Sequence, residues 1–175
     1  MRQRDPLANP APLIRRVYSY VAYRIGSGPE AEDVTSEVFE RAIRYRHSYD
    51  ASRGDALQWL LGIAQRCAND AMSRPPVSLD DPAERASAED LEGEAISRLT
   101  LSQALASLDE RARELIALRY GADLRAREIA MLLDMRTNAV EVALHRALAQ
   151  LRATLEAPAE HAPPDTGESA TQVAR

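Results

Sequence analysis

Apolar side chains recur every three or four residues along much of this 175-residue chain, a spacing typical of amphipathic helices. In the first half, the pattern predicts helices over Leu13 to Ile25, from Pro29 to about Arg46, and from about Ala56 to Ser73. Breaks that contain glycine or proline (GSGP, HSYDASRGD and RPP) separate or end these helices. Three helices of this length are enough to form one small bundle.

The second half has the same spacing in shorter runs. Ser107 followed by Glu110 is a capping box, and it predicts a helix over LDERARELIALRY that ends at Gly121. The other predicted helices are one capped by Ser87 with Asp90 and running through Leu105, a short one near Ala126 to Leu133, and a longer one near Asn138 to Leu155.

Composition indicates an all-α protein. Aromatic residues make up 5% of the sequence and glycines number 7, while alanine, leucine, arginine and glutamate are abundant, so helix is favoured nearly throughout. We expect two small helical domains joined by an acidic linker. The predicted boundaries are 1–12 for a flexible N-terminus, 13–75 for the first domain, 76–99 for the linker, 100–156 for the second domain and 157–175 for a disordered tail.

The acidity of the chain is local. The net charge is -5, and residues 76–99 alone hold 2 arginines against 7 acidic residues. Residues 13–75 hold 9 arginines against 8 acids, and residues 100–156 hold 8 against 8. Both predicted domains are therefore close to neutral, and the overall charge does not exclude a nucleic-acid partner.

Several functional classes lack support. Cys67 is the only cysteine, which excludes an internal disulfide and a multi-cysteine zinc site, and its apolar neighbours indicate a core residue. His47, His145 and His161 have no partners at metal-ligand spacing, and no hydrolase, P-loop or dinucleotide motif is present. No apolar run could span a bilayer or form a secretory signal. We therefore expect a cytoplasmic protein that is not an enzyme, without metal, cofactor, small-molecule substrate or membrane insertion.

The run AEDVTSEVFERAIR predicts a helix with one charged face. At about 100° per residue its apolar side chains fall on one side, and they are Val34, Val38, Phe39, Ala42 and Ile43. The opposite side gathers Asp33, Glu37, Glu40, Arg41 and Arg44. Taken alone, such a face is compatible with a solvated surface held by the pairs Glu37–Arg41 and Glu40–Arg44.

A helix-turn-helix is predicted in REIAMLLDMRTNAVEVALHRAL, where a short helix leads through a tight turn into a longer one. An ordinary helical hairpin has the same periodicity. On the outward side of the longer helix, Arg146 could reach a phosphate or guanine, Asn138 an adenine and Val142 a thymine methyl group. His145 shares this side, and Glu141 at its flank would repel phosphate unless it accepts a hydrogen bond from cytosine.

Taken together and in this order, these stretches resemble the extracytoplasmic-function group of sigma-70-type sigma factors, the promoter-recognition subunits of bacterial RNA polymerase. The resemblance spans most of Leu13 to Leu155. It is carried by AEDVTSEVFERAIR, YDASRGD and WLLGIAQRCANDAMSR in the first domain, and by LDERARELIALRYGADLRAREIAMLLDMRTNAVEVALHRALAQL in the second. The resemblance implies sigma region 2 and sigma region 4, with core RNA polymerase, promoter DNA and an anti-sigma factor as partners.

By this resemblance each surface has an expected role. The charged face would dock on the clamp helices of the largest polymerase subunit, the second domain would meet the flap, and the loop at His47 to Asp55 would hold a base flipped from the melted downstream promoter element. The residues implied for the downstream element are Tyr49, Asp50, Ser52, Arg53, Trp59, Arg66 and Arg74, with a core role for Trp59 equally open. Those implied for the upstream element are Arg136, Thr137, Asn138, Glu141, Val142, His145 and Arg146.

The chain departs from the family pattern in its basic residues. The third helix keeps only Arg66 and Arg74 near its end, and Glu141 to Ala143 replace a basic-small-basic pattern in the recognition helix. Arg125 stands where a capping serine is usual, so Asp123 is expected to cap the following helix. Two further hypotheses remain open at this stage: a conventional dimeric helix-turn-helix regulator, and a sigma-like interaction protein with weakened DNA binding.

Overall fold

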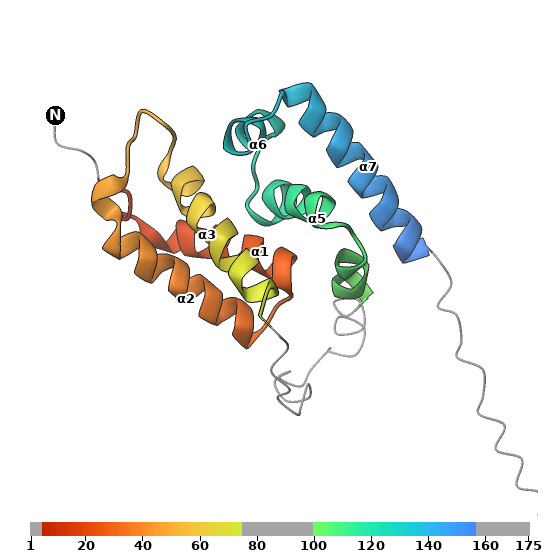
Figure 1. Cartoon of the computed structure of the whole chain (residues 1–175), viewed down its shortest axis with the longest axis horizontal. Coiled ribbons are helices and arrows are strands. Elements are labelled where there is room, and N and C mark those ends of the chain that lie inside the picture. Colours follow the sequence, from red (N-terminus) through yellow and green to blue (C-terminus); the bar gives the residue numbers. More distant parts are fainter. Residues whose placement is uncertain (1–4, 75–99, 157–175) are drawn as a thin grey trace, which may run out of the picture.

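The computed structural model describes residues 5–74 and 100–156, and within these ranges every regular element is helical (Figure 1). The predicted all-α fold class is confirmed. The elements are α1 (Pro10–Ile25), α2 (Pro29–Arg44), a 3₁₀ turn η1 (Arg46–Ser48), α3 (Ala56–Met72), α5 (Glu110–Ile116), a π-helical turn η2 (Ala117–Gly121), α6 (Ala126–Leu132) and α7 (Thr137–Glu156). Residues 100–106 are also helical.

The first three helices pack against one another in the predicted bundle, which we call the first module. Proline occupies the first turn of both α1 and α2, where its missing N–H costs nothing. The buried stripes that face one another across the bundle comprise Val17, Val21, Val34, Val38, Leu57, Leu60, Leu61 and Ala64. Sequence periodicity alone locates these positions, because each stripe repeats at three or four residues.

The helices after residue 109 form the second module, in which α5 and α6 both pack against α7. The short helix α6 leads into α7 through a tight turn, where the Met135 N–H donates to the carbonyl oxygen of Ala130 at 2.8 Å. This is the predicted helix-turn-helix. None of the described helices has the length and apolar character needed to cross a membrane.

Two predicted helix caps are wrong. Ser107 does not cap α5; its hydroxyl donates to the carbonyl oxygen of Ala104 at the end of the preceding helical segment. Asp109 takes the role, since its carboxylate accepts from the Ala112 N–H at 2.7 Å. The buried side chain of Leu108 separates the two candidates, so the serine ends one helix and the aspartate begins the next.

At α6, Arg125 rather than Asp123 holds the N-cap position. The Glu128 carboxylate accepts from the Arg125 N–H at 2.6 Å, which satisfies that backbone group without a cap from Asp123. At the other end of the chain, α1 begins at Pro10 instead of Leu13. The predicted cap at Ser87 and Asp90 falls outside the described residues, as do residues 1–4 and 157–175.

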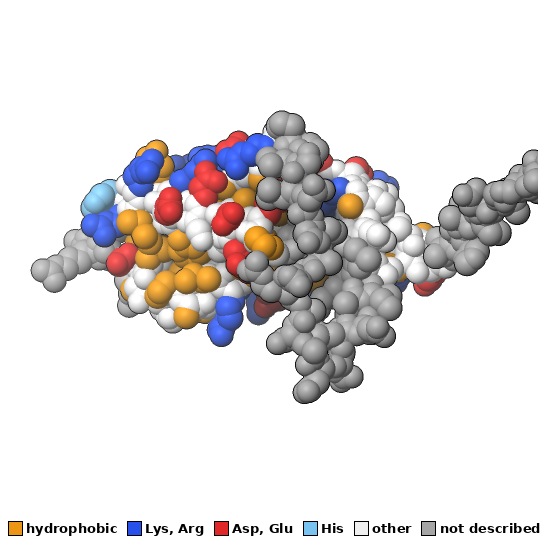
Figure 2. All heavy atoms as spheres, turned by 90° about the horizontal axis from the view of Figure 1, so that it is seen from below, with side chains coloured by type: hydrophobic (Ala, Val, Ile, Leu, Met, Phe, Trp, Pro, Cys, Tyr) orange, Lys and Arg blue, Asp and Glu red, His pale blue; other side chains and the backbone are white. Residues whose placement is uncertain are grey.

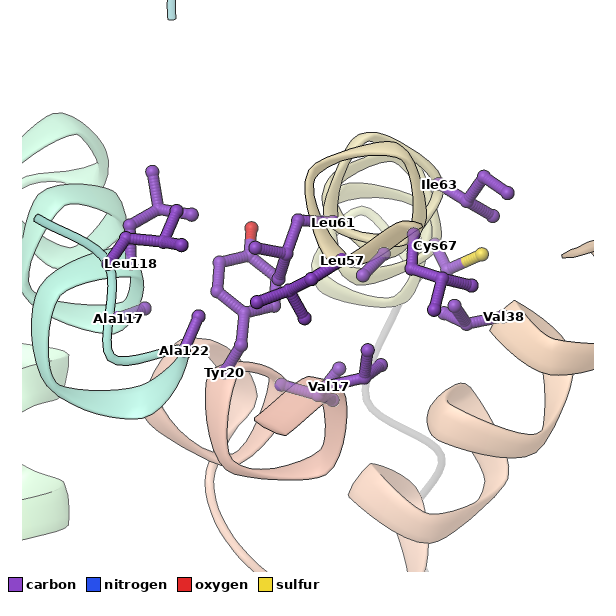
Figure 3. Close-up of a cluster of buried hydrophobic side chains, with 14 of the residues drawn as sticks. Val17, Tyr20, Val38, Leu57, Leu61, Ile63, Cys67, Ala117, Leu118 and Ala122 are labelled. Carbon is purple, nitrogen blue, oxygen red and sulfur yellow. The ribbon is translucent and has the colours of Figure 1, made fainter. Parts of the chain in front are cut away.

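The two modules share one hydrophobic core, which the sequence does not indicate. A single cluster of buried side chains continues from the first module into α5, η2, α6 and α7. Helix α1 lies at the junction and packs against η2 as well as against α2 and α3. In Figure 3, Tyr20 of α1 lies between Leu57 and Leu61 on one side and Ala117, Leu118 and Ala122 on the other.

Candidate nucleic-acid interface

The charged face of α2 is exposed to solvent. Asp33, Glu40 and Arg44 are exposed, and Glu37 and Arg41 are half-buried. Arg41 pairs with Glu37 on its own helix and lies 3.5 Å from the Asp70 carboxylate of α3. Within the described residues no ion pair joins Glu40 to Arg44, so only one of the two predicted i,i+4 pairs forms. Three charged groups of this face therefore remain available to a partner.

Exposed apolar side chains adjoin this face. Ile43, expected on the buried side of α2, is 59% exposed, and Tyr45 just beyond the helix is 54% exposed. The prediction for Ile43 is wrong because it lies at the last turn of α2, where the buried stripe no longer holds it. Figure 2 views the molecule from the side of α2 and shows hydrophobic and charged side chains mixed on that surface. Mixed surfaces of this kind are typical of protein interfaces.

The loop between η1 and α3 is shaped by local hydrogen bonds. Asp50 accepts from the backbone N–H and the hydroxyl of Ser52, at 2.9 and 2.7 Å. These bonds, with Arg53 nearby, lower the pKa of the Asp50 carboxyl. Asp55 caps α3 by accepting from the Gln58 N–H at 2.8 Å, and the Gln58 side chain accepts in return from the Asp55 N–H. The loop is therefore held at both ends.

An aromatic pair fixes the loop to α3. The ring of Tyr49 lies 5.6 Å from that of Trp59, at an interplanar angle of 56°. Tyr49 is only 7% exposed, and its hydroxyl donates to the carbonyl oxygen of Gly54. Tyr49 therefore anchors the loop with a buried ring, while Trp59 is partly exposed.

Beside the loop lies a groove of about 350 Å³, which we call the loop groove. Asp50, Arg53, Trp59 and Arg66 line it, so the fold brings together four of the seven residues predicted for the downstream element. Ser52 is exposed at the loop itself. Arg74 lies apart, in a different groove that also contains Arg24 and Arg113.

Removal of the cap at Asp55 should loosen the loop groove. We expect Asp55→Ala to lower the free energy of unfolding by about 1 kcal/mol, because the Gln58 N–H loses its acceptor. Asp55→Ser keeps an acceptor at the same position and should stay within a few tenths of a kcal/mol of the unaltered chain. Urea unfolding followed by circular dichroism measures both. Equal losses in the two variants would contradict a capping role.

The recognition helix presents all of its predicted upstream residues to solvent. Arg136 precedes α7, Thr137 and Asn138 open it, and each of the seven side chains is exposed. Six of them line two grooves, and Thr137 lines neither. One, of about 530 Å³, is lined by Arg136, Asn138, Val142 and Arg146. The other, of about 340 Å³, is lined by Glu141 and His145.

Both grooves contain arginines that sequence reasoning missed. Arg111 of α5 lines the first groove beside Arg136 and Arg146. Arg119 and Arg125 line the second, where the Arg119 guanidinium lies 5.8 Å from the ring centre of Tyr120. Arg111 in the first turn of α5 opposes the helix dipole, a placement that could have indicated a role outside the helix. The positive charge around the recognition helix is therefore larger than α7 alone supplies.

Other chemistry is not assembled in the described part of the chain. No group of three or more His, Cys, Asp or Glu side chains there could hold a metal ion. Cys67 is buried, and burial raises the pKa of its thiol. It packs in the core as the sequence predicts.

Comparison with known proteins matches both modules to family models. Residues 12–74 match Sigma-70 region 2, and residues 98–151 match Sigma-70 region 4. The ECF RNA polymerase sigma factor SigD of Mycobacterium tuberculosis is 31% identical over 171 residues, which cover 91% of this chain and 79% of SigD. The ECF RNA polymerase sigma factor BldN of Streptomyces coelicolor is 30% identical over 144 residues, covering 77% of this chain and 54% of BldN.

Among solved structures, the sigma factor RpoE in complex with the anti-sigma factor NepR from Bartonella quintana has a similar fold. The TM-score is 0.58 with 16% sequence identity, covering 83% of this chain and 93% of that one. At this level of identity the likeness concerns the fold alone.

Proposed function

The chain belongs to the extracytoplasmic-function group of sigma-70 family sigma factors, which direct RNA polymerase to initiate transcription, and from that premise we propose how its surfaces divide the work. The charged face of α2 (Asp33, Glu37, Glu40, Arg41 and Arg44) docks on the clamp helices of the largest polymerase subunit. The loop groove receives a base of the melted downstream element. The recognition helix reads the upstream element, and the second module also meets the polymerase flap.

One observation carries this proposal. Four of the residues expected for the downstream element line the loop groove, and those expected for the upstream element are exposed on and beside α7, so the two sets form separate clusters, each with arginines for phosphate contact. Within the loop groove, Trp59 provides an aromatic face on which an unpaired base can stack, and Arg53 and Arg66 supply charge. In the described residues, none of these clusters resembles a catalytic constellation.

Two weak contacts become strong when linked. Each module is close to neutral, so neither gains much from counterion release on its own. Polymerase docking holds both modules near the same promoter, which raises the effective concentration of the second contact once the first has formed. We therefore expect this chain to work with polymerase in the cytoplasm.

Gel-shift titration with and without core polymerase tests whether specific DNA binding by this chain requires the polymerase. The free chain should bind duplex promoter fragments only at micromolar concentrations or above, near the non-specific range of about 10⁻⁴ to 10⁻⁶ M. Addition of core polymerase should produce a sequence-specific complex. Tight specific binding by the free chain would contradict the proposal and favour a conventional regulator.

Arg146 should contribute to recognition of the upstream element. We expect Arg146→Ala to weaken promoter binding by the polymerase complex by about 1–3 kcal/mol, because an exposed arginine on this face loses its contact to a base or phosphate. Arg152 is also exposed on α7 but lies beyond both grooves, so Arg152→Ala is the matched control. Equal binding by the two variants would remove Arg146 from the reading surface.

An anti-sigma factor is the third partner that we propose. The solved complex of RpoE with the anti-sigma factor NepR supports this by likeness of fold. The exposed Ile43 and Tyr45 beside the charged face offer apolar contacts that such a protein could cover. A candidate anti-sigma factor should compete with core polymerase for the chain in size-exclusion experiments; simultaneous binding of both would contradict a shared surface.

A further inference from the structure

Glu141 places a negative charge on the part of the recognition helix that faces DNA under the proposed function. It lies in the second turn of α7, next to Val142 and one turn before His145, and all three side chains are exposed. In a helix-turn-helix, residues near the N-terminus of the second helix contact base edges in the major groove. Glu141 is therefore placed among the side chains that meet the bases.

The carboxylate of Glu141 is not neutralised by the part of the chain that the structure describes. The ion pairs formed there involve Arg24 and Arg41, and none includes Glu141. Arg119 and Arg125 line the same groove of about 340 Å³, but neither forms an ion pair with it. Within this part of the chain, the acceptor oxygens of Glu141 are left for a partner.

Arg119 is held in place on one side of the groove. Its Nη1 donates to the carbonyl oxygen of Leu124 at 3.0 Å, and its guanidinium lies 5.8 Å from the ring centre of Tyr120. A guanidinium has five N–H donors, so this bond leaves others for a phosphate. Because the side chain is already oriented, it loses less conformational entropy when it binds.

Arg125 supplies a second positive charge at the same groove. It is the residue before α6, and its side chain is exposed. Its backbone N–H donates to the Glu128 carboxylate at 2.6 Å, which fixes the residue at the start of the helix. Arg119 and Arg125 therefore place positive charge on the segments before α7, while α7 itself presents an acid to the groove.

This arrangement separates the two tasks of a DNA-reading surface. Contacts to phosphates fix the position of a protein on the duplex, whereas contacts to base edges select the sequence. A carboxylate can only accept hydrogen bonds, and in the major groove cytosine offers an amine without an adjacent acceptor. Guanine and thymine present acceptors, and adenine has the N7 acceptor beside its amine, so these three bases repel a carboxylate.

We propose that Glu141 is a specificity-determining residue that selects cytosine at one position of the upstream element, while Arg119 and Arg125 bind nearby phosphates and offset its repulsion of the backbone. The inference rests on the proposed reading of that element by α7. One good contact between a side chain and a base edge gives a preference of about tenfold over the other bases.

Selection from a random duplex library by the holoenzyme, formed from core polymerase and the full chain, tests this assignment. Sequencing of the bound DNA should show cytosine enriched about tenfold at one position of the upstream element. Glu141→Gln should change the preference at that position to adenine, because a glutamine amide pairs with adenine N6 and N7. Glu141→Ala should lose the preference at that position alone.

Glu156→Gln is the matched control, because Glu156 is exposed at the end of α7 and lines neither groove. It should select the same sequences as the unaltered chain. Arg125→Ala should weaken binding to all sequences alike, and should reduce the dependence of log K on log salt concentration by a slope of about 1. A changed base preference in Arg125→Ala would contradict its assignment to phosphate.

Two results would overturn the role of Glu141. One is tighter binding of Glu141→Gln to every sequence without a change in base preference, because the acid then only repels phosphate. The other is a selected element in which cytosine is not enriched at any position, or remains enriched in Glu141→Gln. Failure of the proposed function gives a different result, since the holoenzyme with the unaltered chain would then select no sequence at all.

Discussion

Core RNA polymerase should bind the Asp33→Ala, Glu37→Ala double variant about a hundredfold more weakly than the unaltered chain. Both carboxylates lie on the charged face of α2 proposed to dock on the clamp helices. Removal of two anchor residues from one interface costs roughly 3 kcal/mol, which is about a hundredfold in Kd. Fluorescence anisotropy of the labelled chain titrated with core enzyme measures this change.

Glu32→Ala is the matched control for this experiment. Glu32 is exposed on the same helix but lies about 100° around the axis from Asp33, away from the charged face. It should bind polymerase as the unaltered chain does. Because neither Asp33 nor Glu37 is fully buried, the double variant should keep its helical content. Unchanged polymerase affinity in the double variant would mean that this face is only solvated.

The second large effect concerns stability. Glu114→Ala should lower the free energy of unfolding by about 3–5 kcal/mol, because it leaves the guanidinium of Arg24 buried without its carboxylate partner. Arg24 is 2% exposed and Glu114 is 4% exposed, so water cannot replace the lost charge. Urea unfolding followed by circular dichroism gives the free energy directly.

Glu110→Ala tests whether burial, rather than charge alone, sets the effect of a carboxylate beside Arg24. Glu110 also approaches Arg24, at 3.6 Å, but 72% of its side chain is exposed. Its removal should change the free energy of unfolding by less than about 1 kcal/mol. A double variant, Arg24→Met with Glu114→Leu, should recover only part of the stability lost in Glu114→Ala, because no uncompensated charge remains but the buried Tyr20 hydroxyl still lacks its acceptor. Equal effects of Glu110→Ala and Glu114→Ala would contradict the importance of burial.

Helix positions could be predicted from the sequence because the signals that end helices are strong. Glycine and proline breaks and regular apolar spacing located most helix ends within three residues, from α1 to α7. Capping was less predictable. Ser107 and Asp109 are both good cap residues two positions apart, and only the hydroxyl contact of Ser107 with the preceding helix decides between them.

Surface residues could be predicted by type but not by partner. The loop brings Asp50, Arg53, Trp59 and Arg66 together as the family resemblance implies, but Tyr49 is buried in contact with Trp59. Arg111 could not be assigned to the recognition surface from helical periodicity, because it belongs to a different helix that meets α7 only in the folded chain.

The junction between modules was beyond sequence reasoning. Tyr20 and Glu114 are 94 positions apart, and each occupies an ordinary place in an amphipathic helix. A tyrosine or glutamate within such a pattern is compatible with exposure or burial. The sequence pattern indicates only that Gly121 ends a helix, whereas its lack of a side chain also permits contact with α1.

Run-off transcription with purified core RNA polymerase and fragmented genomic DNA tests the central claim most directly. With this chain added, the polymerase should produce transcripts with discrete 5′ ends that are absent from core enzyme alone and strongly reduced with the Asp33→Ala, Glu37→Ala variant. Core polymerase that binds the chain yet starts at no defined position would contradict promoter recognition, and would instead favour a sigma-like interaction protein.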